Sequence, residues 1–117
     1  VISGYPNEFK QAILSIINNA RDSILKKREE EYFQGKITID TFYENDHIHI
    51  SIKDNGTGIK KENLEKIFEP FFTDKINGDG FGLYMVKLII ADKMDGNIKA
   101  VEQENGANIL IALSKNV

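Results

Sequence analysis

Three polar residues, Ser15, Asn19 and Asp22, recur at spacings of four and three within a stretch whose apolar residues follow helical spacing. Because residues three and four apart lie on the same flank of a helix, the three side chains are expected to share one flank. A solvated surface would explain such a flank without any chemistry. Asn19 differs from its companions because apolar neighbours press it against the margin of the core, where its amide needs a partner. An amide oxygen in that position is a suitable hard ligand for Mg²⁺.

The segment from Asp54 to Ile59, with the sequence DNGTGI, follows a stretch of alternating apolar residues. Asp54 has the parity of the isoleucines before it, so a regular strand would direct its carboxylate to the apolar face, where an unpaired charge is costly. We therefore expect a donor to reach it. The amino group of a ligand could be that donor, while Gly56 and Gly58 let the backbone approach the ligand. A plain Asn-Gly turn, with Asp54 capping nearby amides, is the alternative.

The segment from Gly78 to Leu83, with the sequence GDGFGL, stands directly before a second helical pattern. The unpaired amides and the positive dipole end of a helix N-terminus favour an anion, so this segment predicts a phosphate site. A flexible loop that binds nothing would use the same residue types. The segment is neither a Walker loop, because it lacks Gly-Lys-Ser/Thr, nor a dinucleotide fingerprint that follows a strand.

Two amphipathic helices and four strands are expected to position these segments. Strand pairs that are separated by helices favour an α+β fold, a two-layer sandwich in which a mixed β-sheet is covered on one face by helices. The apolar spacing and the turn residues predict a helix from Phe9 to Ile24, strands from Ile37 to Tyr43 and from His47 to Asp54, a helix from Gly82 to Met94, and strands from Asn97 to Glu102 and from Ala107 to Ser114.

The composition limits the possible partners and predicts one domain over residues 1–117. The chain has 41% hydrophobic residues, which suffices for one core, and a net charge of -3, which provides no electrostatic footprint for nucleic acid or an anionic membrane. It has no cysteine, which suits a cytoplasmic domain. No apolar run approaches the roughly 20 residues of a spanning helix, so we expect any membrane anchor of the parent protein to lie elsewhere.

Taken together, these segments resemble the ATPase superfamily that joins DNA gyrase, the heat-shock chaperone ATPases, the mismatch-repair ATPases and the histidine kinases. A further stretch resembles the F box and nucleotide lid that separate histidine kinases from their relatives. The resemblance implies the Bergerat ATP-binding fold and the catalytic domain of a bacterial two-component sensor histidine kinase. The matching segments are Asn7 to Ile24 for the N box, Asp54 to Ile59 for the first glycine box, Ile67 to Lys75 for the F box and lid, and Gly80 to Leu83 for the second glycine box.

The resemblance also implies roles for individual residues around Mg-ATP. Asn19 would coordinate Mg²⁺, Asp54 would accept a hydrogen bond from the adenine amino group, and Lys75 would neutralise phosphate charge. Gly80, Gly82 and the amide of Leu83 would face the phosphates. The phenylalanines of the F box would position the lid and pack against the domain that supplies the histidine, although Phe68 could equally be a core residue. The remaining residues expected to line the nucleotide are Asp22, Gly56, Gly58, Ile59, Phe72 and Phe81.

The sequence departs from the histidine kinase pattern at a catalytic position. Ser15 lies four residues before Asn19, where these kinases commonly carry an amide, an acid or a histidine, and serine is a poor general base. This departure bears on proton transfer rather than on ATP binding. Asp22 stands where some members have a lysine that faces the phosphates, and Ala107 stands where many have threonine or serine.

The phosphoacceptor is expected to lie on another domain. His47 and His49 are the only histidines, and they lack the flanking charges of the acceptor motif. The partners implied are therefore ATP, the histidine-bearing dimerisation domain of the parent kinase and, indirectly, a response regulator. Two alternatives remain, namely an autonomous ATPase or anti-sigma serine kinase of the same superfamily, and a non-catalytic module in which ATP orders the lid to recruit a partner.

Overall fold

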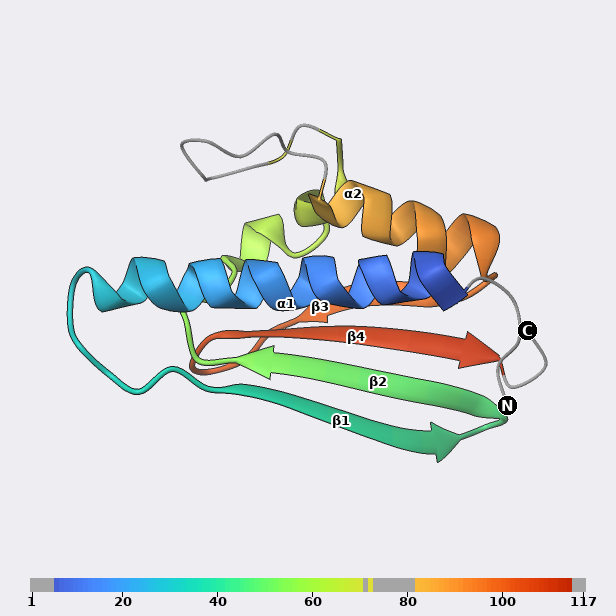
Figure 1. The fold of residues 1–117 in the computed structure, drawn as a ribbon, viewed down its shortest axis with the longest axis horizontal. Helices are drawn as coiled ribbons and strands as arrows, with labels where there is room; N and C mark the ends of the chain where they lie inside the picture. Colours follow the sequence, from blue (N-terminus) through green and yellow to red (C-terminus); the bar gives the residue numbers. More distant parts are fainter. Residues whose placement is uncertain (1–5, 71, 73–81, 115–117) are drawn as a thin grey trace.

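One long helix, α1 (Pro6–Arg28), runs along the whole length of a β-sheet (Figure 1). The computed structural model describes residues 6–70, 72 and 82–114. The helix begins at Pro6, three residues before its first apolar position, because proline is tolerated in a first helical turn. It ends after Lys26, Lys27 and Arg28, whose positive charges favour the C-terminal end of the helix dipole.

The sheet has four strands in the order β1-β2-β4-β3, and every pair of neighbours is antiparallel. The predicted α+β class and the helical layer on one face are confirmed, but the mixed sheet is corrected to an antiparallel one. Each predicted strand pair forms a hairpin, and the second hairpin inserts its last strand beside β2. The two parallel strands, β2 and β3, are thereby kept apart and never pair. The strands are β1 (Ile37–Glu44), β2 (His47–Asp54), β3 (Asn97–Val101) and β4 (Ala107–Ser114).

The remaining helical elements follow the predicted positions in shorter pieces. Between β2 and α2, the chain forms two 3₁₀ turns, η1 (Lys61–Asn63) and η2 (Lys66–Phe68), and the second includes the start of the F box. The second predicted helix forms α2 (Gly82–Lys87), which continues into the wider π-helical turn η3 (Leu88–Lys93). The chain then reverses at Asp95, which has a φ of 52°.

The core lies between the helical layer and one face of the sheet. Ala12, Ile16, Ala20 and Ile24 recur every four residues and form the buried stripe of α1. Alternate residues of β4 are buried, and cross-strand pairs such as Ile50 with Ile111 continue this apolar face into β2. Burying a side chain of this size contributes about 1.5 to 3 kcal/mol to stability. The buried face therefore fixes which residues of β2, Asp54 included, point toward the helices.

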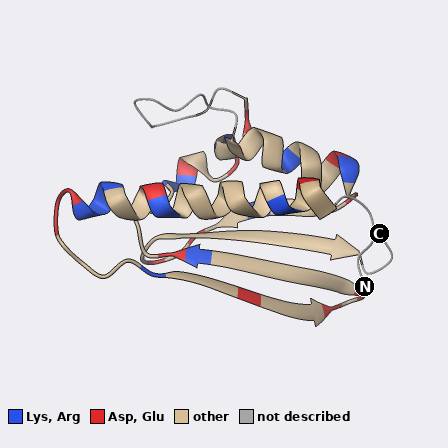
Figure 2. Ribbon diagram, viewed as in Figure 1, with Lys and Arg blue, Asp and Glu red and all other residues tan. Residues whose placement is uncertain are grey.

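Charges of both signs are interspersed along the helical layer, and the strands carry few of them (Figure 2). This distribution agrees with the near balance of acidic and basic residues in the sequence. Among the residues that the structure describes, no helix combines the length and the apolar character needed to cross a membrane.

Candidate functional site

Asp54 is the last residue of β2, and its side chain is on the buried face, as its parity predicts. Only 8% of its surface is exposed. Burial raises the pKa of its carboxyl group, while hydrogen bonds from the amides of Gly56 and Ala107 and the positive charge of Lys27 lower that pKa. The Gly56 amide donates to Oδ1 at 2.8 Å. The protein itself therefore supplies donors to Asp54, and a carboxylate has room for more.

The glycines after Asp54 are required by neighbouring backbone. A Cβ on Gly56 would lie 2.6 Å from the carbonyl carbon of Ser23 and 2.7 Å from the amide nitrogen of Ile24. Gly58 has a φ of 81°, and a Cβ there would lie 3.0 Å from the carbonyl oxygen of Gly106. The approach of a ligand to these glycines stays a prediction. Their packing against α1 and the β3–β4 turn is by itself a reason for glycine at both positions.

Side chains distant in the sequence hold the same loop in place. The Ser23 hydroxyl accepts from the Thr57 amide at 2.8 Å and lies 2.9 Å from the Thr57 hydroxyl. The side-chain amide nitrogen of Gln103, Nε2, donates to the backbone carbonyl oxygen of Asp54 at 3.1 Å. Neither Ser23 nor Gln103 was predicted as a site residue. The only signal for Ser23 was its position four residues after Asn19.

The polar flank of α1 lies where its spacing predicts. Ser15, Asn19 and Asp22 are all partly exposed, at the margin between the buried stripe and solvent. Asp22 pairs with Arg21 at 3.4 Å, which is an exposed ion pair of little energetic weight. Asn19 lies one helical turn before Ser23, so the candidate metal ligand and a contact to the Asp54 loop are on the same helix.

The other predicted site residues fall into three groups. Ile59, Phe72 and Leu83 are partly buried and pack against the core, whereas Phe68 is a core residue with 6% of its surface exposed. Gly82 is exposed, and a Cβ there would meet no atom of the other described residues within 4 Å. The predicted residues Lys75, Gly80 and Phe81 lie outside the described residues.

The sequence matches the family model described as histidine kinase-, DNA gyrase B- and HSP90-like ATPase over residues 4–116. Among curated proteins, it is 32% identical to the two-component sensor PprA of Pseudomonas aeruginosa over 97% of this chain. It is 36% identical to sporulation kinase C of Bacillus subtilis over 91% of this chain. The matched regions amount to 12% and 23% of these two relatives, so the chain spans a minor part of their length.

The fold is similar to a solved catalytic domain of the histidine kinase ThkA in a nucleotide-free form. The TM-score is 0.83 at 30% sequence identity, and the match covers 98% of this chain and 71% of that one. The chain therefore belongs to the histidine kinase-, DNA gyrase B- and HSP90-like ATPase family, and within it to the catalytic domains of sensor histidine kinases.

Proposed function

We propose that residues 1–117 form a single catalytic domain that binds Mg-ATP and donates the γ-phosphate to a histidine on a separate phosphoacceptor domain. Membership in the family supports ATP as the ligand. The observation that carries the proposal is the buried carboxylate of Asp54 at the C-terminal end of β2, followed by a loop that is itself bound to α1. A buried carboxylate with free acceptor capacity suits the exocyclic amino group of adenine.

The phosphates are proposed to lie toward the N-terminus of α2. Gly82, the first residue of α2, is exposed and lies clear of the other described residues, which supports a ligand there. Gly80, Gly82 and the amide of Leu83 would face the phosphates, with Lys75 and Asp22 nearby and Phe81 beside them. Ile59 and Phe72, whose side chains pack against the core, would border the nucleotide.

Asn19 is the residue proposed to hold Mg²⁺. Magnesium usually keeps several waters and takes only one or two protein oxygens when substrate phosphates complete its shell. A single amide oxygen at the margin of the core fits that requirement, and Asn19 is in that position. Mg²⁺ bound with the nucleotide would neutralise charge on the phosphates during transfer.

Transfer to histidine needs little from Ser15. A neutral imidazole near pH 7 already has a free nitrogen lone pair, so positioning of the acceptor against the γ-phosphate can replace a strong base. The histidines of this chain are engaged locally: the His49 ring stacks on Phe42 at 4.8 Å, and His47 Nδ1 lies 2.8 Å from the carbonyl oxygen of Asn45. These contacts support an acceptor on another domain. A response regulator would then receive the phosphate, and we propose that both reactions take place in the cytoplasm.

A labelled-ATP assay tests this proposal. The γ-labelled nucleotide is incubated with the parent kinase, or with this domain and a supplied acceptor domain, and acid-labile phosphohistidine is measured against free phosphate. We expect label on the acceptor histidine and little free phosphate. Brisk phosphate release without any phosphohistidine would identify an autonomous ATPase, and nucleotide binding with neither product would identify a non-catalytic module.

A further inference from the structure

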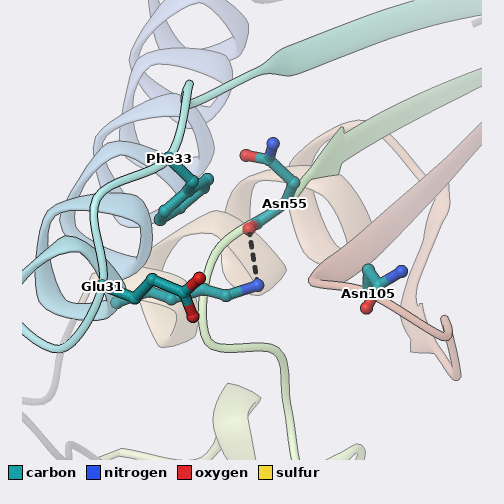
Figure 3. A pocket seen from close by; sticks show the side chains of 5 residues that line it. Glu31, Phe33, Asn55 and Asn105 are labelled. Carbon is teal, nitrogen blue, oxygen red and sulfur yellow. Dashed lines mark hydrogen bonds between the residues drawn. The ribbon is translucent and has the colours of Figure 1, made fainter.

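The C-terminal end of α1 forms a small pocket with the loop after β2, and Lys27 is one of the residues that line it. Lys27, Glu31, Phe33, Asn55 and Asn105 line this pocket (Figure 3). The Lys27 ammonium donates to the carbonyl oxygen of Asn55 at 3.3 Å. The same ammonium lies 5.0 Å from the centroid of the Phe33 ring, within the range of a cation–π interaction. Lys27 is thus held from two sides and is bound directly to the peptide that follows Asp54.

Asn55 connects this contact to the segment between α1 and β1. Its side-chain oxygen accepts from the Lys36 amide at 2.8 Å, and its side-chain nitrogen donates to the carbonyl oxygen of Gln34 at 3.0 Å. Phe33 belongs to the same connecting segment. Lys27 therefore binds the backbone carbonyl group of Asn55. The side chain of Asn55 binds the segment between α1 and β1, to which Phe33 belongs.

Three residues on α1, spaced by four, face the proposed nucleotide site and its loop. Asn19 is the proposed metal ligand, Ser23 binds Thr57, and Lys27 binds Asn55. Residues spaced by four form one line along a helix. Gly56 lies between the two loop contacts, where its missing side chain allows it to touch the backbone of Ser23 and Ile24. The loop is consequently attached to α1 at two points, one on each side of Gly56.

Lys27 also acts on Asp54 through its charge. Burial raises the pKa of Asp54, and the positive charge of Lys27 acts in the opposite direction and lowers that pKa. Glu31 is the other charged residue that lines the pocket. The ionised carboxylate carries only acceptor oxygens, so it can accept a hydrogen bond from an amino group without donating one itself.

We propose that Lys27 is a positioning residue for nucleotide selection, which holds the Asn55 peptide so that the Asp54 carboxylate is fixed in place to accept from the 6-amino group of adenine. This inference rests on the proposed function, since it takes Asp54 to be the adenine acceptor. A residue that merely stabilised the fold would weaken binding of every nucleotide alike. Removal of a residue that acts through Asp54 weakens the binding of only those nucleotides that carry the 6-amino group.

The test compares ADP with inosine diphosphate, in which an oxo group replaces the 6-amino group. Dissociation constants are measured by calorimetry in the full chain for wild type, Lys27→Met, Lys27→Arg, Asp54→Ala and the control Lys10→Met. Lys10 is an exposed lysine near the other end of α1. Wild type and Lys10→Met are expected to prefer ADP equally, and Asp54→Ala is expected to lose the preference.

Lys27→Met is expected to reduce the preference for ADP by about two-fold to ten-fold, the range of one hydrogen bond, with inosine diphosphate affinity unchanged. Lys27→Arg, which keeps the charge and N–H donors, is expected to retain most of the preference. Equal weakening of both nucleotides by Lys27→Met, or loss of the preference in Lys27→Arg, overturns the inference. If Lys27→Met does not fold, Lys27→Ala takes its place, with the same expected reduction because the donor to Asn55 is lost. An unchanged preference in Asp54→Ala contradicts the adenine assignment itself, which separates the two failures.

Discussion

The two hairpin turns lie at opposite ends of the sheet and need different residues. At the β1–β2 turn, Asn45 and Asp46 have φ values of 54° and 63°, and both are exposed. At the β3–β4 turn, Gly106 has a φ of 93°, and a Cβ there would lie 2.6 Å from the carbonyl carbon of Asp54. The first turn requires a left-handed backbone, which Asn and Asp tolerate. The second requires that backbone and also the absence of a side chain, because it packs against the proposed adenine site.

This comparison predicts that changes beside the Asp54 loop alter nucleotide chemistry, whereas changes at the β1–β2 turn alter stability only. The largest effect is expected at Asn19. Asn19→Ala should lower phosphotransfer about a hundred-fold or more, because an interaction with transferring charge is worth several kcal/mol, while most of the nucleotide affinity remains. Phosphohistidine formation and calorimetric affinity are measured in the same variant. Equal losses in both would identify Asn19 as a structural residue, and Asn45→Ala is the control that should change neither.

The second prediction compares the turns directly through their stability. Gly106→Ala should lower the free energy of unfolding by about 2 to 4 kcal/mol, since it adds backbone strain and an overlap with the Asp54 peptide. Asn45→Ala should cost about 1 kcal/mol, because only the left-handed conformation is penalised. Urea denaturation of both variants checks this difference. Similar losses at the two positions would show that the contact between Gly106 and Asp54 is unimportant.

The third prediction tests the acceptor itself. Asp54→Ala should weaken Mg-ADP binding by about ten-fold to a hundred-fold, since a charged hydrogen-bond partner contributes roughly 1.5 to 3 kcal/mol. Asp46→Ala, at the β1–β2 turn, is the matched control and should bind as wild type does. Calorimetry that finds wild-type affinity in Asp54→Ala would refute the adenine assignment.

The smallest effect is expected at Ser15. The domain alone should hydrolyse ATP very slowly, because a serine cannot readily deprotonate water. Ser15→Glu, which adds a carboxylate base, should raise phosphate release by about ten-fold and change transfer to a supplied acceptor histidine much less. The two products are compared in wild type and variant. Brisk hydrolysis by wild type, or no gain in Ser15→Glu, would show that the account of Ser15 is wrong.

Local patterns predicted the elements well and the long-range contacts poorly. The bounds of β2 and β4 follow from alternation and turn residues, and the direction of the Asp54 side chain follows from parity. The antiparallel pairing could not be predicted in the same way, because it depends on the insertion of β4 between β2 and β3. The partners of the Asp54 loop, Ser23 and Gln103, lie far from it in the sequence, so no local spacing indicated them.

The 23-residue length of α1 has a consequence for how this domain could be observed in solution. At about 1.5 Å per residue, the helix is roughly 35 Å long, and it carries both the proposed metal ligand and the attachments of the Asp54 loop. A ligand that restrains the loop would also restrain the helical turns that contain Ser23 and Lys27. Amide hydrogen exchange should therefore slow through the C-terminal half of α1 when nucleotide binds, as far as the turn that contains Lys27.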